Sequence, residues 1–468
     1  MPTALNLIKG DKMGAETDYR DALPVNMTAV IRDVFGAKGY MIQEAGLTAH
    51  GTGAGIDRGG IWNERFQDHY RVSGSSLLSV AASGVSSSLG AISGADIVSL
   101  PYSFNTQGIV ADGKFWLYSP SGGLVQVTDP DLGSPIDCVW VDGYYFFTDG
   151  EYIYHTDISS ESAIDPLKYA TSEFSPDPTL GVAKTGDNKV VVFNRYTTEY
   201  FVNVATDDFA FQKVATRAIK IGIVGTHCKI EVGDTWFIMG GRKEEAVGVH
   251  QLGVGAANKV STREIDKIIG LYNEAQLSVA ELETYQEDGY AHVIVHLPNH
   301  TLKFNYTVAQ AFGPQFAWSI IKSDVLGDNP WRGINGVFDA RIGQWVFGDK
   351  NGPLLGILDN TVGTQYGNIV EWVMYTPYAY IEDQSIDQLE IQTIPGFTTT
   401  VDATVFLSLS YDGVTWGNER TIEYGGPYEY SKRFIVYRLG YVRDWVGFKL
   451  RGATRSRMAF TAAVIEHG

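Results

Sequence analysis

Short apolar runs alternate with Gly, Asp or Asn turns along most of this chain. In each unit a turn introduces about four to six β-branched or aromatic residues, and a second turn leads to a partner run, which is the pattern of a β-hairpin. The units start roughly 30 to 55 residues apart, close to the repeat of a β-propeller blade. The pattern predicts an all-β, propeller-like domain of about five to seven blades. The units begin at Gly59, Ala111, Val141, Gly186, Val232, Glu287 and Asp339.

One segment, residues 261–285, departs from this pattern. Its apolar residues recur at helical spacing behind Ser261 and Thr262, with Glu264 following as in a capping box. A short helix is therefore expected near residues 262–272. The apolar positions are Ile265, Ile268, Ile269 and Tyr272.

The apolar runs become longer after residues 359–368, and they alternate over the last hundred or so residues with hairpin turns between them. This alternation is typical of a β-sandwich. We therefore expect two domains, a propeller-like hub domain over residues 1–365 and a C-terminal β-sandwich over residues 366–468. A length of 468 residues is consistent with more than one hydrophobic core.

Cysteine content and the N-terminal residues bear on the compartment. The two cysteines, Cys138 and Cys228, lie in apolar strand-like runs, so we expect buried free thiols. Lys9, Asp11 and Lys12 occupy the place where a signal peptide has its apolar region, and no run reaches the ~18 apolar residues of a membrane span. Synthesis in a reducing cytoplasm, without a targeting signal, is the expectation.

The formal net charge is −18 and the isoelectric point is about 4.9. Phosphate attraction needs Lys and Arg, so this charge argues against a protein that grips nucleic acid over its whole surface. A passage through which DNA slides is a different case, because mild repulsion keeps the duplex from adhering to the wall.

One hairpin, residues 410–416, reads Ser-Tyr-Asp-Gly-Val-Thr-Trp and approaches the repeated box of sialidase propellers. The box needs one more residue between Asp and Gly and recurs in several blades, whereas here it occurs once. An Asp412-Gly413 turn between two strands explains the same residues. The alternative function is a carbohydrate-binding or glycan-cleaving protein that uses Tyr411, Asp412 and Trp416.

Other candidate chemistry is weak. His292, His296 and His300 are spaced four apart, but the segment is β-branched, and in a strand His292 and His296 would lie about 13 Å apart, too far for one metal ion. The glycine-rich residues 51–60 lack the strand-then-helix context and the Lys of a phosphate loop. We therefore predict no catalytic residue, no cofactor and no metal.

Basic residues gather near the C-terminus. Between Glu429 and Arg457 eight Lys and Arg residues face two acids, Glu429 and Asp444. One interpretation is a solvated sheet face or a contact with an acidic neighbour. The other is a ring of positive charge around DNA in an oligomer. The candidate residues for a DNA-channel or subunit contact are Arg433, Arg438, Arg443, Arg451, Arg455 and Arg457.

Segments spread over nearly the whole chain resemble the tail-hub proteins of short-tailed bacteriophages (podoviruses), also called head-closure or packaged-DNA stabilization proteins. The similarity weakens over residues 50–110, and no catalytic motif defines the family. The similar segments are "DALPVNMTAV" (21–30), "TEYFVNVA" (198–205), "IKIGIVGTHCK" (219–229), "HVIVHLPNHTLKFN" (292–305), "GPQFAWSIIKS" (313–323), "LSYDGVTWGNERTI" (409–422) and "GFKLRGATRSRMAF" (447–460).

The resemblance implies a structural virion protein rather than an enzyme. Six copies would form a homohexameric ring below the portal and its head-to-tail adaptor ring, extend the DNA channel and retain the packaged genome. The ring would also seat the tail needle or plug and the tailspikes or fibres, and it would pass double-stranded DNA without sequence preference. Its implied location is the virion tail, after assembly in the bacterial host cytoplasm. A third interpretation is a scaffold propeller of the host cell.

Overall fold

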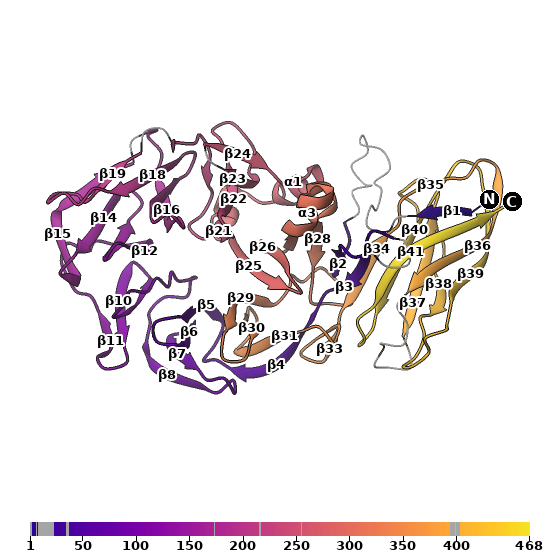
Figure 1. Cartoon of the computed structure of the whole chain (residues 1–468), viewed down its shortest axis with the longest axis horizontal. Helices are drawn as coiled ribbons and strands as arrows, with labels where there is room; N and C mark the ends of the chain where they lie inside the picture. The colour runs from indigo at the N-terminus through magenta and orange to yellow at the C-terminus, as the bar shows by residue number, and fades with distance from the viewer. Residues whose placement is uncertain are drawn as a thin grey trace.

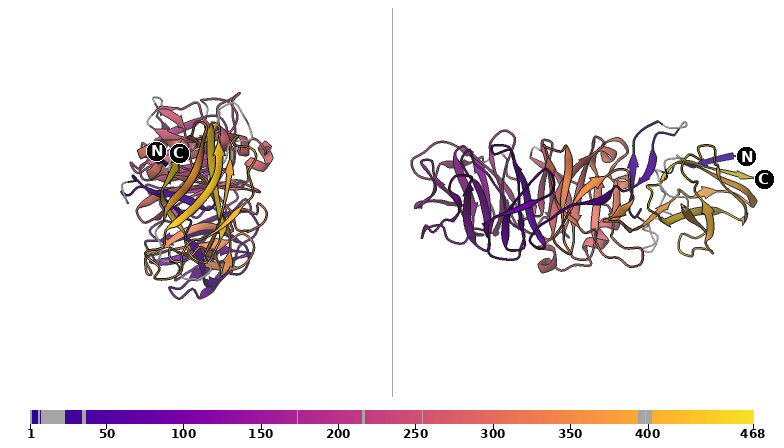
Figure 2. Two further views of the ribbon diagram at one scale, coloured as in Figure 1. Left: turned by 90° about the vertical axis from the view of Figure 1, so that its right-hand side faces the viewer. Right: turned by 90° about the horizontal axis from the view of Figure 1, so that it is seen from below.

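The computed structural model describes residues 2–5, 7, 23–33, 37–172, 174–214, 217–253, 255–393, 398 and 403–468. Lys9, Asp11 and Lys12, on which the signal-peptide argument depends, lie outside these residues, as do residues 21 and 22 of the first similar segment. Figure 1 shows a ring of sheets beside a pair of packed sheets, and Figure 2 shows the two bodies end to end in an elongated molecule. The all-β class predicted from the hairpin pattern is confirmed.

The ring contains seven sheets within the described residues, numbered here as blades 1 to 7, and their strands pair antiparallel except for β32 with β4 in blade 7. Each predicted hairpin unit lies in one of them. Blade 1 has β5 (Asp57–Asn63), β6 (Asp68–Ser73), β7 (Ser76–Val80) and β8 (Ser86–Ala91); blade 2 has β9 (Gln107–Ala111), β10 (Lys114–Ser119) and β11 (Gly123–Gln126). Blade 3 has β12 (Asp137–Val141), β13 (Tyr144–Thr148), β14 (Tyr152–Asp157) and β15 (Ser160–Thr171); blade 4 has β16 (Thr179–Lys184), β17 (Val190–Asn194), β18 (Thr198–Asn203) and β19 (Phe211–Lys213).

Blades 5 to 7 complete the ring. Blade 5 has β20 (Gly222–Ile223), β21 (Lys229–Val232), β22 (Thr235–Gly241), β23 (Gly248–Gly253) and β24 (Ala256–Lys259). Blade 6 has β25 (Glu281–Glu287), β26 (Tyr290–His296), β27 (Thr301–Asn305) and β28 (Trp318–Ile321). Blade 7 has β29 (Gly333–Asp339), β30 (Gln344–Asp349), β31 (Leu354–Asp359) and the earlier strand β4 (Gly46–Thr52), followed by β32 (Thr364–Gln365) and β33 (Asn368–Ile369).

The ring closes through pairing between distant parts of the chain. β4 pairs antiparallel with β31, from Thr52 opposite Leu354 to Gly46 opposite Asp359. Of the six strands of blade 7, β4 thus comes from the beginning of the propeller sequence and the other five from its end. This shared sheet holds the first and last blades together without a covalent bond, because every ladder hydrogen bond between β4 and β31 opposes opening of the ring.

Helices occur at two places among the blades. α1 (Arg263–Ile269) and α2 (Glu274–Leu277) lie between blades 5 and 6; α1 falls within residues 262–272, where a short helix was expected, and α2 follows that segment. Ile265 and Ile269 of α1 are buried, whereas Thr262 at its N-cap makes no side-chain capping bond. α3 (Tyr306–Phe312) and the 3-10 helix η4 (Pro314–Phe316) connect β27 to β28.

The second body is a β-sandwich of two sheets. One sheet has the order β2 (Met27–Val30), β3 (Tyr40–Gln43), β41 (Ala459–His467), β36 (Gln384–Thr393) and β39 (Phe434–Val442), with β1 (Pro2–Leu5) also on β41. The other has the order β34 (Glu371–Tyr375), β40 (Trp445–Ala453), β37 (Thr404–Ser410) and β38 (Arg420–Glu423), with β35 (Ala379–Tyr380) also on β40.

The N-terminal strands differ from the expected division of the chain into residues 1–365 and 366–468. β1 pairs with β41 of the sandwich, and Met41 of β3 lies opposite Phe460 of the same strand. The residues that precede the propeller therefore belong to the sandwich sheet. The physical reason is that a strand joins whichever edge offers free backbone groups, which its own sequence does not specify.

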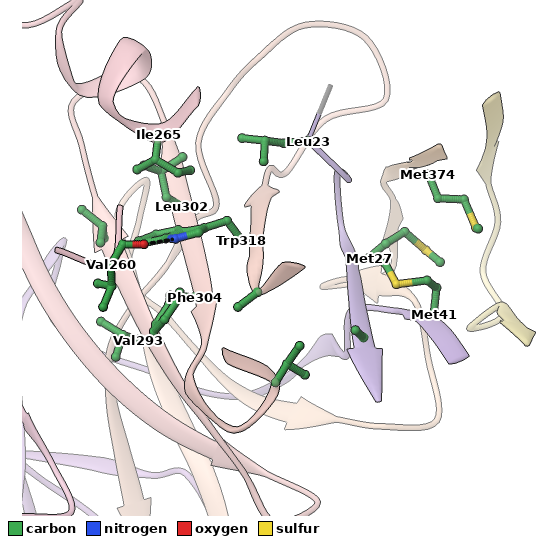
Figure 3. Close-up of a cluster of buried hydrophobic side chains, with 14 of the residues drawn as sticks. Leu23, Met27, Met41, Val260, Ile265, Val293, Leu302, Phe304, Trp318 and Met374 are labelled. Atoms are coloured by element: carbon green, nitrogen blue, oxygen red, sulfur yellow. Dashed lines mark hydrogen bonds between the residues drawn. The ribbon is translucent and has the colours of Figure 1, made fainter. Parts of the chain in front are cut away.

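One hydrophobic cluster runs from the propeller into the sandwich. On the propeller side Phe304 packs on Trp318, whose Nε1 donates a hydrogen bond to the Val260 carbonyl at 2.9 Å. On the sandwich side Met27 and Met374 are buried in the same cluster (Figure 3). Because interiors are close-packed, this continuity couples the positions of the two bodies.

Candidate functional sites: the propeller axis, the junction and the basic segment

The carboxylate of Asp137 joins four blades. Asp137 is the first residue of β12 in blade 3, and its Oδ1 accepts a hydrogen bond from Ser99 Oγ, in the segment that pairs with β9 of blade 2, at 2.6 Å. Its Oδ2 accepts from the Val182 backbone amide of blade 4 at 2.8 Å and from Lys229 Nζ of blade 5 at 2.7 Å. A buried carboxylate that accepts from several donors fixes the distances between the strands that carry those donors.

Gly181 lets the inner strand of blade 4 pass beside this ion pair. A Cβ at position 181 would lie 2.9 Å from Lys229 Nζ and 3.1 Å from Asp137 Oδ2. The Lys229 side chain therefore bridges blades 3 and 5 across the inner strand between them.

A second buried ion pair lies where blade 7 meets blade 1. Arg71 is fully buried, and its Nε and Nη2 donate to the two carboxylate oxygens of Asp57 at 2.8 and 3.0 Å. Arg71 Nη2 also donates to the Asn335 carbonyl at 2.7 Å, and Asn335 Nδ2 donates to Asp57 at 2.9 Å. Burial raises the pKa of Asp57 and the Arg71 guanidinium opposes that rise. The bonds connect β5 and β6 of blade 1 to β29 of blade 7.

His69 and Arg341 extend this network. Arg341 Nη2 donates to Asp339 Oδ2 at 2.7 Å, and Arg341 Nη1 donates to Asp68 Oδ1 of blade 1 at 3.0 Å. His69 Nδ1 lies 3.4 Å from Asp339. Burial lowers the pKa of His69 to about 4, so its imidazole is neutral at pH 7. Burial alone would raise the pKa of Asp339, but hydrogen bonds with His69 and Arg341 hold it below its usual range.

Blades 6 and 7 share a third polar cluster. His296 of β26 contacts Glu283 Oε1 through Nε2 at 2.5 Å and Lys350 Nζ through Nδ1 at 2.7 Å. Glu283 Oε2 in turn accepts from the Gly336 amide of β29 at 2.8 Å. Burial lowers the pKa of His296 to about 4 and that of Lys350 to about 8. The chain of contacts from Lys350 to Gly336 joins the two blades, and it is enclosed by Trp331, which stacks on His296.

The junction between propeller and sandwich contains two more buried ion pairs. Lys303 of β27 contacts Glu44, which follows β3. Arg457, just before β41, donates through Nη2 to Glu287 Oε1 of β25 at 2.5 Å and through Nε to the Gln43 carbonyl at 2.5 Å. Burial raises the pKa of Glu44, an effect that the Lys303 ammonium opposes. Two positive and two negative groups thus balance in one cluster that links blade 6 to the sandwich.

The six arginines predicted as a DNA or subunit contact do not gather into one patch. Arg457 is buried at the junction, with its side chain 9% exposed. Arg451 of β40 pairs with Glu419 at 2.6 Å and lies over the Phe406 ring, and Arg433 pairs with Glu390 at 2.6 Å. Arg433 is 62% exposed despite its ion pair. The other exposed members are Arg438 in a bulge of β39, Arg443 in the β39–β40 turn, and Arg455 in the loop before β41.

Residues 410–416, the segment that resembles the sialidase box, form hydrogen bonds mainly among themselves. Asp412 Oδ1 accepts from the amides of Val414 and Thr415 at 2.8 and 2.7 Å, and these bonds lower the pKa of Asp412 to about 2. Trp416 packs against Tyr375. The loop differs from the expected two-residue hairpin, since β37 and β38 are separated by residues 411–419 and only the glycine of the Asp-Gly pair has a positive φ. The Asp412 carboxylate, by accepting two amides, stabilises this longer turn.

The remaining motifs lie in strands and turns. His292 and His296 are buried in β26, and His300 contacts the Tyr272 hydroxyl. In the described part of the chain no group of three His, Cys, Asp or Glu residues is placed to hold a metal ion, and no helix is long and apolar enough to cross a membrane. Cys138 and Cys228 are buried free thiols, as expected. Residues 51–60 run from β4 into β5 without a helix.

The inter-blade carboxylates were not found from the sequence. Asp137 and Asp57 each begin a strand after a turn or bend, where an aspartate usually signals only turn chemistry. The one signal available in the sequence is Arg71, a charged residue in the middle of the strand-like segment "HYRVS". The structure shows that all five residues of this segment are buried. A buried charge needs a partner, so Arg71 alone could have indicated a buried ion pair.

The fold and these sites define a class of protein: a seven-bladed propeller that is packed against, and hydrogen-bonded to, a β-sandwich. The chain matches the family described as "Bacteriophage P22 Gp10, beta-propeller" over residues 3–363 and the family described as "Bacteriophage P22 Gp10, beta-sandwich" over residues 371–468. The chain therefore belongs to the bacteriophage P22 Gp10 family.

Known proteins similar to the chain include one full-length relative. The tail hub protein gp10 of Salmonella phage P22 is 30% identical over 483 residues, which cover 98% of each chain. Two solved propellers are similar to the chain at low identity. Virginiamycin B lyase from Staphylococcus aureus matches with a TM-score of 0.43 and 12% identity over 68% of this chain and 99% of its own. The Pan2 WD40 domain of Neurospora crassa matches with a TM-score of 0.42 and 10% identity over 68% and 96%.

Proposed function

We propose that the chain is a tail hub of a short-tailed bacteriophage: a structural, non-enzymatic component of the virion tail, assembled in the host cytoplasm. The observation that carries the proposal is the full-length relationship to the P22 tail hub protein, in both domains and in the same order. Six copies form a ring below the portal and its adaptor, extend the DNA channel and retain the genome. The ring also seats the needle and the tailspikes or fibres.

The buried ion pairs support a mechanical role. The Asp137–Lys229 pair joins blades 3 and 5, and the Glu287–Arg457 pair joins the propeller to the sandwich. Hydrogen bonds from the Asp57–Arg71 pair to Asn335 join blades 1 and 7, and the β4–β31 ladder closes the ring. A body that is held by such contacts resists deformation by packed DNA, since each contact must break before the blades separate. Six copies at −18 each carry a formal charge of about −108, which keeps a duplex from adhering to the channel wall.

Four of the six predicted arginines have exposed side chains that are available for a contact with DNA or with a neighbouring subunit. They are Arg438, Arg443 and Arg455, together with Arg433, which also pairs with Glu390. Arg451 and Arg457 are engaged with glutamates of the same chain. A few exposed positive charges on an acidic ring position the duplex weakly and without sequence preference, as phosphate contacts do.

Negative-stain imaging of the purified chain mixed with portal–adaptor complexes tests the proposal. We expect an added sixfold ring on the adaptor face. In parallel, phage particles that lack this chain should lose their packaged DNA. Complexes that gain no density, together with DNA-filled particles in the absence of the chain, would refute it. Glycan binding that is abolished by Trp416→Ala would instead support the carbohydrate alternative.

A further inference from the structure

Exposed apolar side chains gather on the outer edge of blade 3, at the end of the molecule opposite the sandwich (Figures 1 and 2). Leu167 is 81% exposed, Ile158 70% and Tyr169 52%, all on or between β14 and β15. A single exposed apolar residue is ordinary, but several on one hairpin form the kind of patch that contacts another protein.

A bulge in β15 presents Leu167 to solvent. The register between β14 and β15 shifts twice, and the extra residues 165–168 lie outside the regular ladder. Asp165 Oδ1 accepts a hydrogen bond from the Leu167 amide at 3.0 Å, and Lys168 Nζ donates to Asp157 Oδ1 at 2.9 Å. Such bonds fix the bulge, so Leu167 needs little further ordering when a partner binds.

The charge around this patch restricts the partner. Five acidic side chains that are at least partly exposed lie in the β13–β14 turn and the β14–β15 hairpin, against one basic residue, Lys168; they are Asp149, Glu151, Asp157, Glu161 and Asp165. DNA is repelled by such a surface, because phosphates carry the same charge. A partner must instead combine apolar or aromatic side chains with exposed arginines or lysines.

The sandwich of the same chain offers a surface with that chemistry. Tyr411 is 52% and Tyr437 60% exposed. Arg420 Nη1 donates to the Tyr437 carbonyl at 3.1 Å, and the neighbouring Arg438 is exposed. Arg420 and Arg438 are in no ion pair with the described residues. Tyrosine and arginine are enriched at protein contacts, where their planar groups bury area at low entropic cost.

Building on the ring proposed above, we infer that the blade 3 edge of one copy docks on the Tyr411/Tyr437/Arg420/Arg438 face of a second copy. Leu167 packs against the tyrosines, and the acidic rim of blade 3 faces the two arginines. The two surfaces are unlike and lie on opposite bodies of the elongated chain. The contact is therefore heterologous, and it repeats from copy to copy until the ring closes.

Photo-cross-linking in the full chain tests this contact. A photoreactive phenylalanine analogue replaces Leu167, and the protein is assembled on portal–adaptor complexes before irradiation and mass spectrometry. We expect cross-links to residues 411–443 of a second copy. The matched control places the analogue at Leu326, which is 86% exposed and lies away from blade 3, and should give none. Rings that form but cross-link Leu167 elsewhere, or to another protein, overturn the inference and leave the proposed function standing. Absence of rings in the unmodified protein overturns both.

Charge reversal gives an independent readout. Glu151 is exposed next to Tyr152, whose ring packs on Tyr169 of the patch. Glu151→Arg and Arg438→Glu should each lower the fraction of complexes with a complete ring about tenfold, and the double variant should recover most of the loss. Circular dichroism shows whether each variant is folded. Single variants that assemble like the wild type, or a double variant no better than either single one, contradict the contact.

Discussion

Lys229 Nζ and Asp137 Oδ2 lie 2.7 Å apart, although 92 residues separate them in the sequence. Their side chains are 10% and 4% exposed, and they come from blades 5 and 3. Both charges are therefore largely shielded from solvent. Removal of one partner from such a pair costs far more than removal of one partner from a surface pair.

Lys229→Met should lower the free energy of unfolding by about 3 kcal/mol, because Asp137 keeps its charge and loses its cation. Denaturant unfolding followed by tryptophan fluorescence measures the change. Adding Asp137→Asn should recover part of the loss. The exposed pair of Lys432 and Glu423 serves as the control, and Lys432→Met should change stability by less than about 1 kcal/mol. Equal effects of the two lysine substitutions would contradict the role of the buried pair.

Gly240→Ala should prevent normal pairing of β20 with β22 in blade 5. A Cβ at position 240 would lie 1.8 Å from the Gly222 carbonyl oxygen, which is backbone and cannot rotate away. We expect a loss of about 3 kcal/mol or failure to fold, measured by thermal unfolding and soluble yield. Gly186→Ala is the matched control, since no atom lies within 4 Å of its Cβ position, and its stability should stay near that of the wild type.

Acid should destabilise the propeller through its buried histidines. The pKa of His296 is about 4 in the folded chain against an ordinary value of 6.5, so the unfolded chain binds more protons between these pH values. Stability that is present above pH 6.5 is therefore lost as the pH falls toward 4. His296→Gln should reduce the difference in unfolding free energy between about pH 7 and about pH 4.5. An unchanged difference would show that His296 does not titrate on unfolding.

Arg457→Met should weaken the junction, because Glu287 and the Gln43 carbonyl lose their donor inside a buried cluster. We expect a loss of about 3 kcal/mol and faster hydrogen exchange in β3 and β41. Arg455→Met, two residues earlier and exposed, should change stability by less than about 0.5 kcal/mol. Similar exchange in the two variants would show that Arg457 is not a junction residue.

The basic segment shows the limit of charge counting. Eight Lys and Arg residues against two acids suggested a free positive surface, but Arg433, Arg451 and Arg457 find Glu390, Glu419 and Glu287 elsewhere in the fold. Their partners lie 43, 32 and 170 residues away, beyond any local window of sequence. A count of charged residues along a segment therefore does not give the net charge of the surface that the segment forms, because acidic residues from other segments can pair with its arginines.

The sequence by itself determined what depends on near neighbours. Turn residues and period-two runs specified one hairpin in each of the seven blades, the change of pattern near residue 366, and the helical segment that contains α1. These features follow from backbone conformations that a few adjacent residues control.

The tertiary structure alone decided which distant segments meet. The pairing of β4 with β31 and of β1 with β41, like the contacts of Asp137 with three other blades, joins residues whose local sequences carry no mark of one another. Any strand edge or buried charge can accept many partners. The choice among them is made only when close packing of the whole chain brings particular edges and charges together.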